Sequence, residues 1–274
     1  MNRGDLKFSE VAYLSGIAAT EWSWSALFAD FDNDSHQDLF ITNGIKGATN
    51  NMDYIKFIST EEIQQQISTG EKIDLENLTK RLPEKKVNNY IFRNSGDQKF
   101  TNASEEWLPA QKSFSHGSIY VDLDDDGDLD LVTNNTEDTA FIYENTTTES
   151  NFLKIDLQGP DRNRFGIGAK VTVHTKEVTQ MKEHYLSRGY LSSLAPGLHF
   201  GLGSNTVVDS VTVKWYDGSK TVLGKVKANQ KVIVKYSASA KNKKETAKLP
   251  AYEFANDSIL NYKHVEQASL DFNR

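Results

Sequence analysis

The chain has 274 residues, of which 38% are hydrophobic and 25% charged, and it contains no cysteine. This length accommodates one or two globular domains, and the lack of cysteine excludes disulfides and thiolate chemistry. The formal net charge of −7 disfavours a general nucleic-acid-binding protein. No apolar run approaches the length of a membrane span, and the polar stretch 1–11 lacks the apolar core of a signal peptide.

Two acidic stretches, residues 28–41 and 120–132, share one spacing. In each, aspartates stand at positions 1, 3, 5 and 9 of a short segment, so a tightly curled chain would bring their carboxylates together. Carboxylate oxygens in such a loop suit Ca²⁺, which accepts six to eight oxygens in flexible geometry. The predicted Ca²⁺ ligands are Asp30, Asp32, Asp34, His36, Asp38, Asp122, Asp124, Asp126, Asp128 and Asp130, with His36 and Asp128 contributing backbone carbonyls.

Two other interpretations of the acidic stretches were weighed. An EF-hand requires a glutamate at loop position 12, where this chain has Ile41 and Thr133. A merely solvated acidic turn is the simpler alternative, but two copies with matching apolar flanks disfavour it. The flanks are short and partly β-branched or aromatic, as strands are. We therefore predict calcium loops within β-hairpins.

The two loops differ at position 6, which is Ser35 in the first and Gly127 in the second. A left-handed backbone at this position favours glycine. Serine in this conformation would cost about 1–2 kcal/mol, which corresponds to roughly tenfold in calcium affinity. The second loop also has Asp125 where the first has neutral Asn33. We expect the second loop to bind calcium more tightly, and Ser35→Gly to tighten the first.

Internal repetition organises the first half of the chain. Residues 2–8 resemble 94–100 at an offset of 92, and residues 90–94 resemble 141–145 at an offset of 51. The difference indicates an insertion at about 46–86, where apolar residues follow helical spacing, including a second short helix at about 75–81. The insertion would serve either as a partner-binding lid or as a packing decoration. Repeat units of this size stack as blades.

The acidic loops with their flanking strands, and the NxGDxxF motif, resemble the FG-GAP/VCBS repeats of β-propellers over residues 1–147. This resemblance implies calcium-bearing blades. Propellers typically need four to eight blades, whereas this chain has two full acidic loops. We expect an open arc of blades whose unpaired strand edges favour self-association.

A different pattern begins after the repeats, and we assign residues 151–237 to a small antiparallel β-sandwich-like domain. Val171 and Val173, then Val211, Val213 and Trp215, alternate along their strands and should share a buried face. The predicted strands are 152–157, 169–174, 211–215 and 231–236, with turns at Gly159, Gly197, Gly201, Gly203 and Asp217-Gly218.

Four motifs in this domain, at 166–169, 188–192, 199–203 and 215–218, resemble the ASPIC/UnbV domain. That domain follows VCBS repeats in bacterial surface proteins and in the cartilage acidic protein family. Residues 238–250 are interpreted as a linker, and 251–274 resemble the start of a further repeat region. The whole is thus all-β, with partial propeller blades and a helical insertion, and is expected to be a fragment of a longer bacterial surface protein.

The favoured function is a non-catalytic, calcium-binding surface or secreted module that binds a protein or polysaccharide. We expect an extracellular location, with the export signal on sequence that precedes this chain. The alternative is an enzyme, or an accessory domain of a biosynthetic or carbohydrate-processing enzyme, whose site would contain His184, Arg188 and His199. One cavity holding these three would favour the enzyme, and scattered histidines would favour the binding module.

Overall fold

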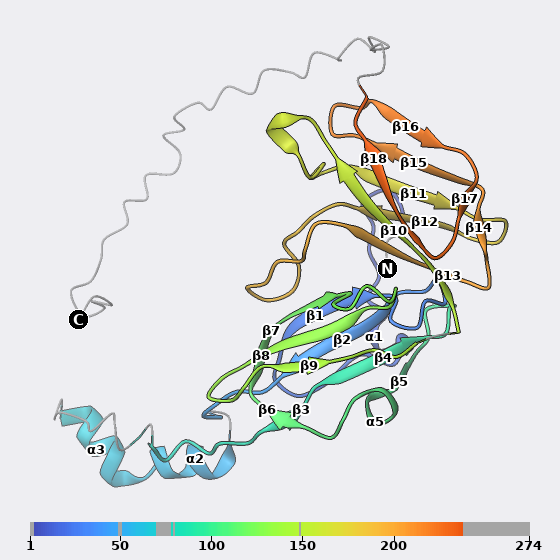
Figure 1. The fold of residues 1–274 in the computed structure, drawn as a ribbon. Coiled ribbons are helices and arrows are strands. Elements are labelled where there is room, and N and C mark those ends of the chain that lie inside the picture. The colour runs from blue at the N-terminus through green and yellow to red at the C-terminus, as the bar shows by residue number, and fades with distance from the viewer. Residues whose placement is uncertain (1–2, 49–50, 70–77, 79, 148, 238–274) are drawn as a thin grey trace, which may run out of the picture. The chain divides into compact units, whose positions relative to one another are not determined.

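The computed structural model describes residues 3–48, 51–69, 78, 80–147 and 149–237. Strands account for most of its regular structure, and the helices are short. The predicted all-β class, with partial blades, a helical insertion and a sandwich, is confirmed (Figure 1). The predicted linker at 238–250 and further repeat region at 251–274 lie outside the described residues. In the described part of the chain, no helix is both long and apolar enough to cross a bilayer.

Two blade-like sheets form the repeat region. The first has the order β1-β2-β4-β5 and the second the order β7-β8-β9. The acidic loops join β1 to β2 and β7 to β8, so each loop stands at the end of a hairpin. The strands are β1 Ser23–Ala29, β2 Asp38–Asn43, β4 Tyr90–Asn94, β5 Phe100–Asn102, β7 Ser115–Val121, β8 Asp130–Asn135 and β9 Phe141–Tyr143.

The two sheets repeat each other residue by residue. Phe40 pairs with Ile91 in the first sheet, and Val132 pairs with Ile142 in the second. Both hairpins also carry a register shift at the same place, between Ser23 and Ala26 in β1 and between Ser115 and Ser118 in β7. The offsets found in the sequence therefore correspond to equivalent strand positions.

The turn after β4 has a counterpart at the start of the chain. Ser95 N donates to Lys99 O at 3.0 Å, and Arg3 N donates to Lys7 O at 2.8 Å. Asp97 and Asp5 both have φ of 49°. The tripeptide Arg3-Gly-Asp is thus part of a repeat turn, as the sequence alignment indicates.

The insertion contains the two helices α2 (Met52–Ile58) and α3 (Glu61–Thr69). The Asn51 side chain caps α2 by accepting from Asp53 N and Tyr54 N at 2.9 and 3.2 Å. Most of the second predicted helix, at about 75–81, lies outside the described residues. A short ribbon, β3 Val87–Asn88 with β6 Lys112–Ser113, and two single-turn helices, α1 Ala12–Ser15 and α5 Ser104–Trp107, complete this half.

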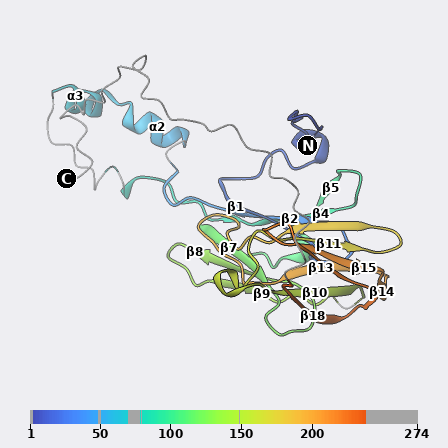
Figure 2. The same cartoon turned by 90° about the horizontal axis from the view of Figure 1, so that it is seen from above.

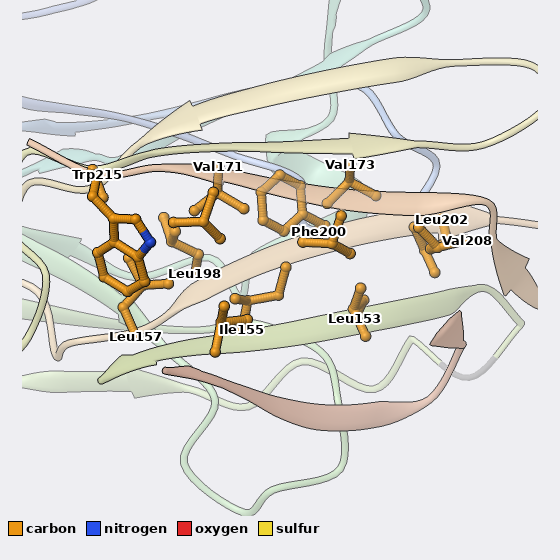
Figure 3. Packing of buried hydrophobic residues seen from close by; sticks show 14 residues of the cluster. Leu153, Ile155, Leu157, Val171, Val173, Leu198, Phe200, Leu202, Val208 and Trp215 are labelled. Carbon is orange, nitrogen blue, oxygen red and sulfur yellow. The ribbon is translucent and has the colours of Figure 1, made fainter. Parts of the chain in front are cut away.

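The second domain is a sandwich of two sheets, ordered β13-β10-β18 and β12-β11-β15-β16, beside a small ribbon β14-β17. Its core includes Val171, Val173, Val211, Val213 and Trp215, all at most 2% exposed, as predicted (Figure 3). The elements are β10 Asn151–Gln158, η1 Asp161–Asn163, β11 Lys170–His174, β12 Thr179–Glu183, β13 Leu198–Gly203, β14 Val207–Val208, β15 Ser210–Lys214, β16 Lys220–Leu223, β17 Val226–Lys227 and β18 Gln230–Lys235.

Two details of this domain differ from the sequence prediction. The pairing of β10 with β18 is parallel, so the smaller sheet is mixed rather than wholly antiparallel. Gly201 and Gly203, predicted to lie in turns, belong to strand β13. Glycine in a strand interior often marks a close approach of another backbone, and this explanation applies to Gly201, as described below.

Hydrogen bonds and a ring contact join the sandwich to the repeat sheets; Figure 2 shows the same elements from above. The segment between β12 and β13 lies on the strands β1 and β7. There Tyr190 N donates to Ser25 Oγ at 3.3 Å, and the rings of Trp24 and Tyr190 are 4.9 Å apart. Ser118 Oγ in turn donates to Ser25 Oγ at 2.9 Å. These contacts join the two sheets and the sandwich at one place.

Candidate metal centres in two acidic loops

We define the first loop as residues 30–38 and the second as residues 122–130. Both are closed by the same hydrogen bond, in which the backbone N–H of position 6 donates to the carboxylate of position 1. Ser35 N donates to Asp30 Oδ2, and Gly127 N donates to Asp122 Oδ2, each at 2.9 Å. The shared aspartate spacing therefore produces one shared backbone frame.

The position 9 aspartates fasten each loop to its sheet. Asp38 accepts from Phe31 N at 3.0 Å and from Asn94 N at 2.8 Å. Asp130 makes the equivalent pair with Leu123 N at 2.8 Å and Asn145 N at 2.9 Å. Since both oxygens of each carboxylate already accept a backbone N–H, these residues position the loop at least as much as they offer oxygens to an ion.

Three carboxylates come together in each loop, with candidate ligand atoms within 4.8 Å of one another. They are Asp30, Asp32 and Asp38 in the first loop and Asp122, Asp124 and Asp126 in the second. Of the other predicted ligands, Asp34 accepts from His36 N at 2.8 Å and lies 3.2 Å from the His36 ring nitrogen Nδ1. The carbonyl role assigned to His36 and Asp128 stays a prediction.

Several carboxylate oxygens in the loops are buried without a hydrogen bond from the described residues. They are Asp30 Oδ1, Asp32 Oδ2, Asp122 Oδ1 and Asp128 Oδ1. Asp32 Oδ2 does lie 2.9 Å from Arg93 Nε as an ion pair. A buried charged oxygen without a partner costs free energy, and a hard cation would compensate for it. The donor set is all oxygen, as Ca²⁺ requires.

Burial also changes the acidity of these groups. It raises the pKa of Asp30 to about 8 and that of Asp38 to about 7, and neighbouring aspartates add to the effect. Burial, with the negative charge of Asp126, raises the pKa of Asp128 to about 7. A bound cation would favour the ionised forms of these carboxylates.

The backbone at position 6 is left-handed in both loops, with φ of +81° at Ser35 and +103° at Gly127. This agrees with the conformation expected from the sequence. Gly127 has a second reason to be glycine, because a Cβ there would lie 1.9 Å from the Phe152 ring of the sandwich. That close approach cannot be read from the loop sequence.

The strand β13 of the sandwich lies directly on the first loop. Gly203 N donates to Asn33 O at 2.7 Å, and Ser35 Oγ donates to Gly201 O at 3.1 Å. A Cβ at Gly201 would lie 2.1 Å from Asp30 Oδ2, so only glycine allows this contact. The sequence motif at 199–203 is therefore explained by its contact with an acidic loop.

Asn33 connects both loops and the sandwich. Its Nδ2 donates to Gly127 O at 3.1 Å, while its Oδ1 lies 2.6 Å from His199 Nε2. With Nδ2 acting as the donor, Oδ1 accepts from a protonated Nε2. His199 is thus a neutral, structural histidine, and burial lowers its pKa to about 3.

Two lysines of the sandwich face the loops, and sequence reasoning missed both. Lys154 forms an ion pair with Asp122 and lies 3.1 Å from Asp125 Oδ1. Lys182 is largely buried, and the opposite charge of Asp30 acts on it. Lys154 alternates with the core residues Leu153 and Ile155, and this pattern places its side chain on the face away from the sandwich core.

The three side chains of the enzyme alternative do not surround one cavity. Arg188 and His199 line a cavity of about 460 Å³, but His184 is not part of its lining. His184 is buried, and its pKa is lowered by that burial. The condition that would favour an enzyme is therefore not met by these three residues.

Comparisons with known proteins agree with the observed organisation. Residues 84–163 match the family model of an FG-GAP-like repeat, and residues 159–241 match the model ASPIC and UnbV. Cartilage acidic protein 1 from Mus musculus and from Homo sapiens is 35% identical over 106 residues, which cover 37% of this chain and 16% of each relative. The Xenopus tropicalis protein of that name is 26% identical over 245 residues, or 79% of this chain and 37% of the relative. The chain thus carries an FG-GAP-like repeat followed by an ASPIC and UnbV domain, and it is similar to part of cartilage acidic protein 1.

Proposed function

We propose that both acidic loops bind Ca²⁺ and that the ions fix the arrangement of the repeat sheets and the sandwich. The observation that carries this proposal is the buried, unpartnered Oδ1 of Asp30 and of Asp122, which stand at the same position in two loops of one frame. A divalent cation would compensate for their charge. Because β13 and β10 contact the loops, an ion there would also stabilise the contact between the two parts of the chain.

The residues that would hold the ions follow from the clusters. Asp30 and Asp32 would supply oxygens in the first loop, where Asp32 now pairs with Arg93, and Asp122, Asp124 and Asp126 would do so in the second. Asp128 adds a buried, unpartnered Oδ1 that the sequence did not predict as a ligand atom. The ninth-position aspartates would mainly hold the loops in shape. The second loop should be the tighter site, since its charge is larger and its position 6 is unstrained.

We propose that the module acts outside the cell as a non-catalytic binder of a protein or polysaccharide. Extracellular modules use calcium sites of modest affinity, at about 10⁻⁴–10⁻³ M. The similarity to cartilage acidic protein 1, whose name refers to cartilage, supports this location. The outermost strands β5 and β9 would offer edges for self-association, and Ile142 in β9 is 65% exposed.

Thermal unfolding with and without calcium tests the metal proposal. In 10 mM CaCl₂ the melting temperature should rise by several degrees above its value in EDTA, because a ligand at 100 times its Kd adds about 2.7 kcal/mol. The double variant Asp32→Ala/Asp124→Ala should lose this rise, whereas Asp53→Ala, on the exposed surface of α2, should keep it. An equal rise in the double variant, or an equal rise with MgCl₂, would contradict a calcium role for the loops.

A further inference from the structure

A cavity of about 460 Å³ lies between the repeat region and the sandwich. Phe28 and Tyr120 line it from the repeat strands β1 and β7, and Met181, Lys182 and Arg188 line it from the sandwich side. Its volume falls in the range of small-molecule sites, which combine apolar walls with a few placed polar groups. Neither its walls nor its charges are explained by the acidic loops alone.

Most of the charged groups that line the cavity are already paired. Lys154 pairs with Asp122 and Asp125, and Lys231 Nζ lies 3.6 Å from Asp156 Oδ2. The remaining carboxylate, that of Glu183, accepts from the Tyr185 hydroxyl and lies 3.6 Å from Lys170 Nζ. The other two cations of the lining are Lys182, on which the charge of Asp30 acts, and Arg188.

Neither of these two cations has a carboxylate oxygen within 4 Å among the described residues. Lys182 Nζ donates to His199 O at 2.5 Å, and Arg188 Nη2 donates to Glu183 O at 3.0 Å. Backbone carbonyls thus hold both groups in place and leave further N–H donors on each. Burial lowers the pKa of Lys182 to about 8, Asp30 opposes this, and the charge of Arg188 adds a smaller lowering.

We propose that this cavity binds a small organic carboxylate, whose anionic group lies between Lys182 and Arg188. A guanidinium offers a planar fork that matches a carboxylate, and the nearby ammonium adds a second charge. The apolar body of the ligand would lie against Phe28, Tyr120 and Met181. Asp122 and Asp125 of the second loop also line the cavity, so the test below is made without calcium.

Titration of the isotopically labelled, metal-free chain with sodium benzoate, followed by NMR after EDTA has been removed, tests the proposal. Benzoate should shift the signals of Met181 and Arg188, whereas benzamide, its uncharged analogue, should leave them unchanged. Arg188→Gln should weaken benzoate binding about tenfold or more, while Arg162→Gln, an exposed arginine on η1 that does not line the cavity, should have no effect. Equal shifts from benzamide, or unchanged binding by Arg188→Gln, would overturn the proposal.

Two further variants and one inorganic probe keep the test decisive. Arg188→Lys keeps the charge but lacks the fork, so it should bind benzoate better than Arg188→Gln and less well than the wild type. Lys182→Met should also lose binding, with its amide spectrum compared to that of the wild type to verify folding. Phosphate binding more tightly than benzoate at the same signals would refute the carboxylate assignment.

Discussion

The two acidic loops share a backbone frame and differ in what surrounds them. In the first loop, on which strand β13 lies, Asp30 and Asn33 are each 1% exposed, and Asp32 and Asp34 are half-buried. In the second loop Asp124 and Asp126 remain exposed to solvent. The comparison teaches that the loop sequence determines the hydrogen-bonded frame, whereas distant strands determine how far an ion's site is covered.

The charges differ as well. The first loop has four aspartates. Asp32 forms an ion pair with Arg93, and the positive charge of Lys182 acts on Asp30. The second loop has six aspartates, and Asp122 forms an ion pair with Lys154. The second loop therefore has the larger net negative charge when the neighbouring lysine and arginine side chains are counted with each loop. This difference supports the order of affinity proposed from the sequence.

Gly201→Ala should have the largest effect on the first loop. The new Cβ would meet Asp30 Oδ2 at 2.1 Å and the backbone of Asn33 at 2.6 Å. Neither the strand nor the loop backbone can move aside easily, so we expect a loss of about 3 kcal/mol in the free energy of unfolding. Chemical denaturation measures this loss. Gly224→Ala is the matched control, since its Cβ would meet nothing within 4 Å, and equal losses in both variants would refute the explanation.

Lys154→Met should change the second loop in two opposite ways. Without metal, the variant should lose about 1–2 kcal/mol of stability, since the Asp122 carboxylate loses its partner in a partly buried place. With calcium, the affinity of that loop should rise about tenfold, because the ion no longer competes with the ammonium group. Calorimetric titration checks this. Lys86→Met, which removes a lysine that pairs with Asp138 outside the loop, should leave calcium affinity unchanged.

The pH dependence of stability should separate the metal-free and calcium-bound forms. Asp30, Asp38 and Asp128 have folded pKa values of about 8, 7 and 7, above the ordinary value of 3.8. Their contribution to stability is therefore full below about pH 4 and is lost as the pH rises through 7 and 8. In EDTA the melting temperature should fall by a few degrees between pH 5 and pH 8.5.

Saturating calcium should flatten or reverse this fall, since the ion binds the ionised carboxylates. Asp30→Asn should remove the part of the fall that belongs to Asp30, and Asp53→Asn, on exposed α2, should not. A melting temperature in EDTA that rises over the same pH range would show that these carboxyls do not titrate as described.

Ser35→Gly should have the smallest effect. Glycine relieves the left-handed strain, worth about 1 kcal/mol, but it removes the bond from Ser35 Oγ to Gly201 O, worth a similar amount. The metal-free stability should thus change by less than about 0.5 kcal/mol. Calcium affinity of the first loop should rise only a few-fold, less than the tenfold expected from the loop sequence alone. Titration in the Asp124→Ala background isolates this loop, and a gain of tenfold or more would contradict a role for the Gly201 contact.

Much of the repeat region could be predicted because its signals are local. The aspartate spacing predicted the loops, and the apolar flanks predicted the strands on either side of them. The left-handed backbone at Ser35 and Gly127 was expected for the same reason, since it follows from neighbours within the loop.

The remaining features depend on contacts between residues far apart in the chain. Nothing near Gly201 in the sequence indicates that Asp30 lies against it, so that glycine was assigned to a turn. Lys154 lies on a predicted strand, whereas Lys182 lies on β12, which was not predicted, and the carboxylates near both stand on the other half of the chain. The parallel pairing of β10 with β18 also joins distant segments, and local periodicity cannot distinguish it from an antiparallel pairing.

Calorimetric titration of the metal-free chain with CaCl₂ tests the central claim, that the two loops are calcium sites of unequal affinity. The wild type should show two sites, and Asp124→Ala should remove the tighter one while Asp32→Ala removes the weaker one. Asp124→Ala should accordingly reduce the calcium-dependent rise in melting temperature more than Asp32→Ala does. If no calcium heat is observed, or if Asp32→Ala removes the tighter site, the account of the two loops is contradicted.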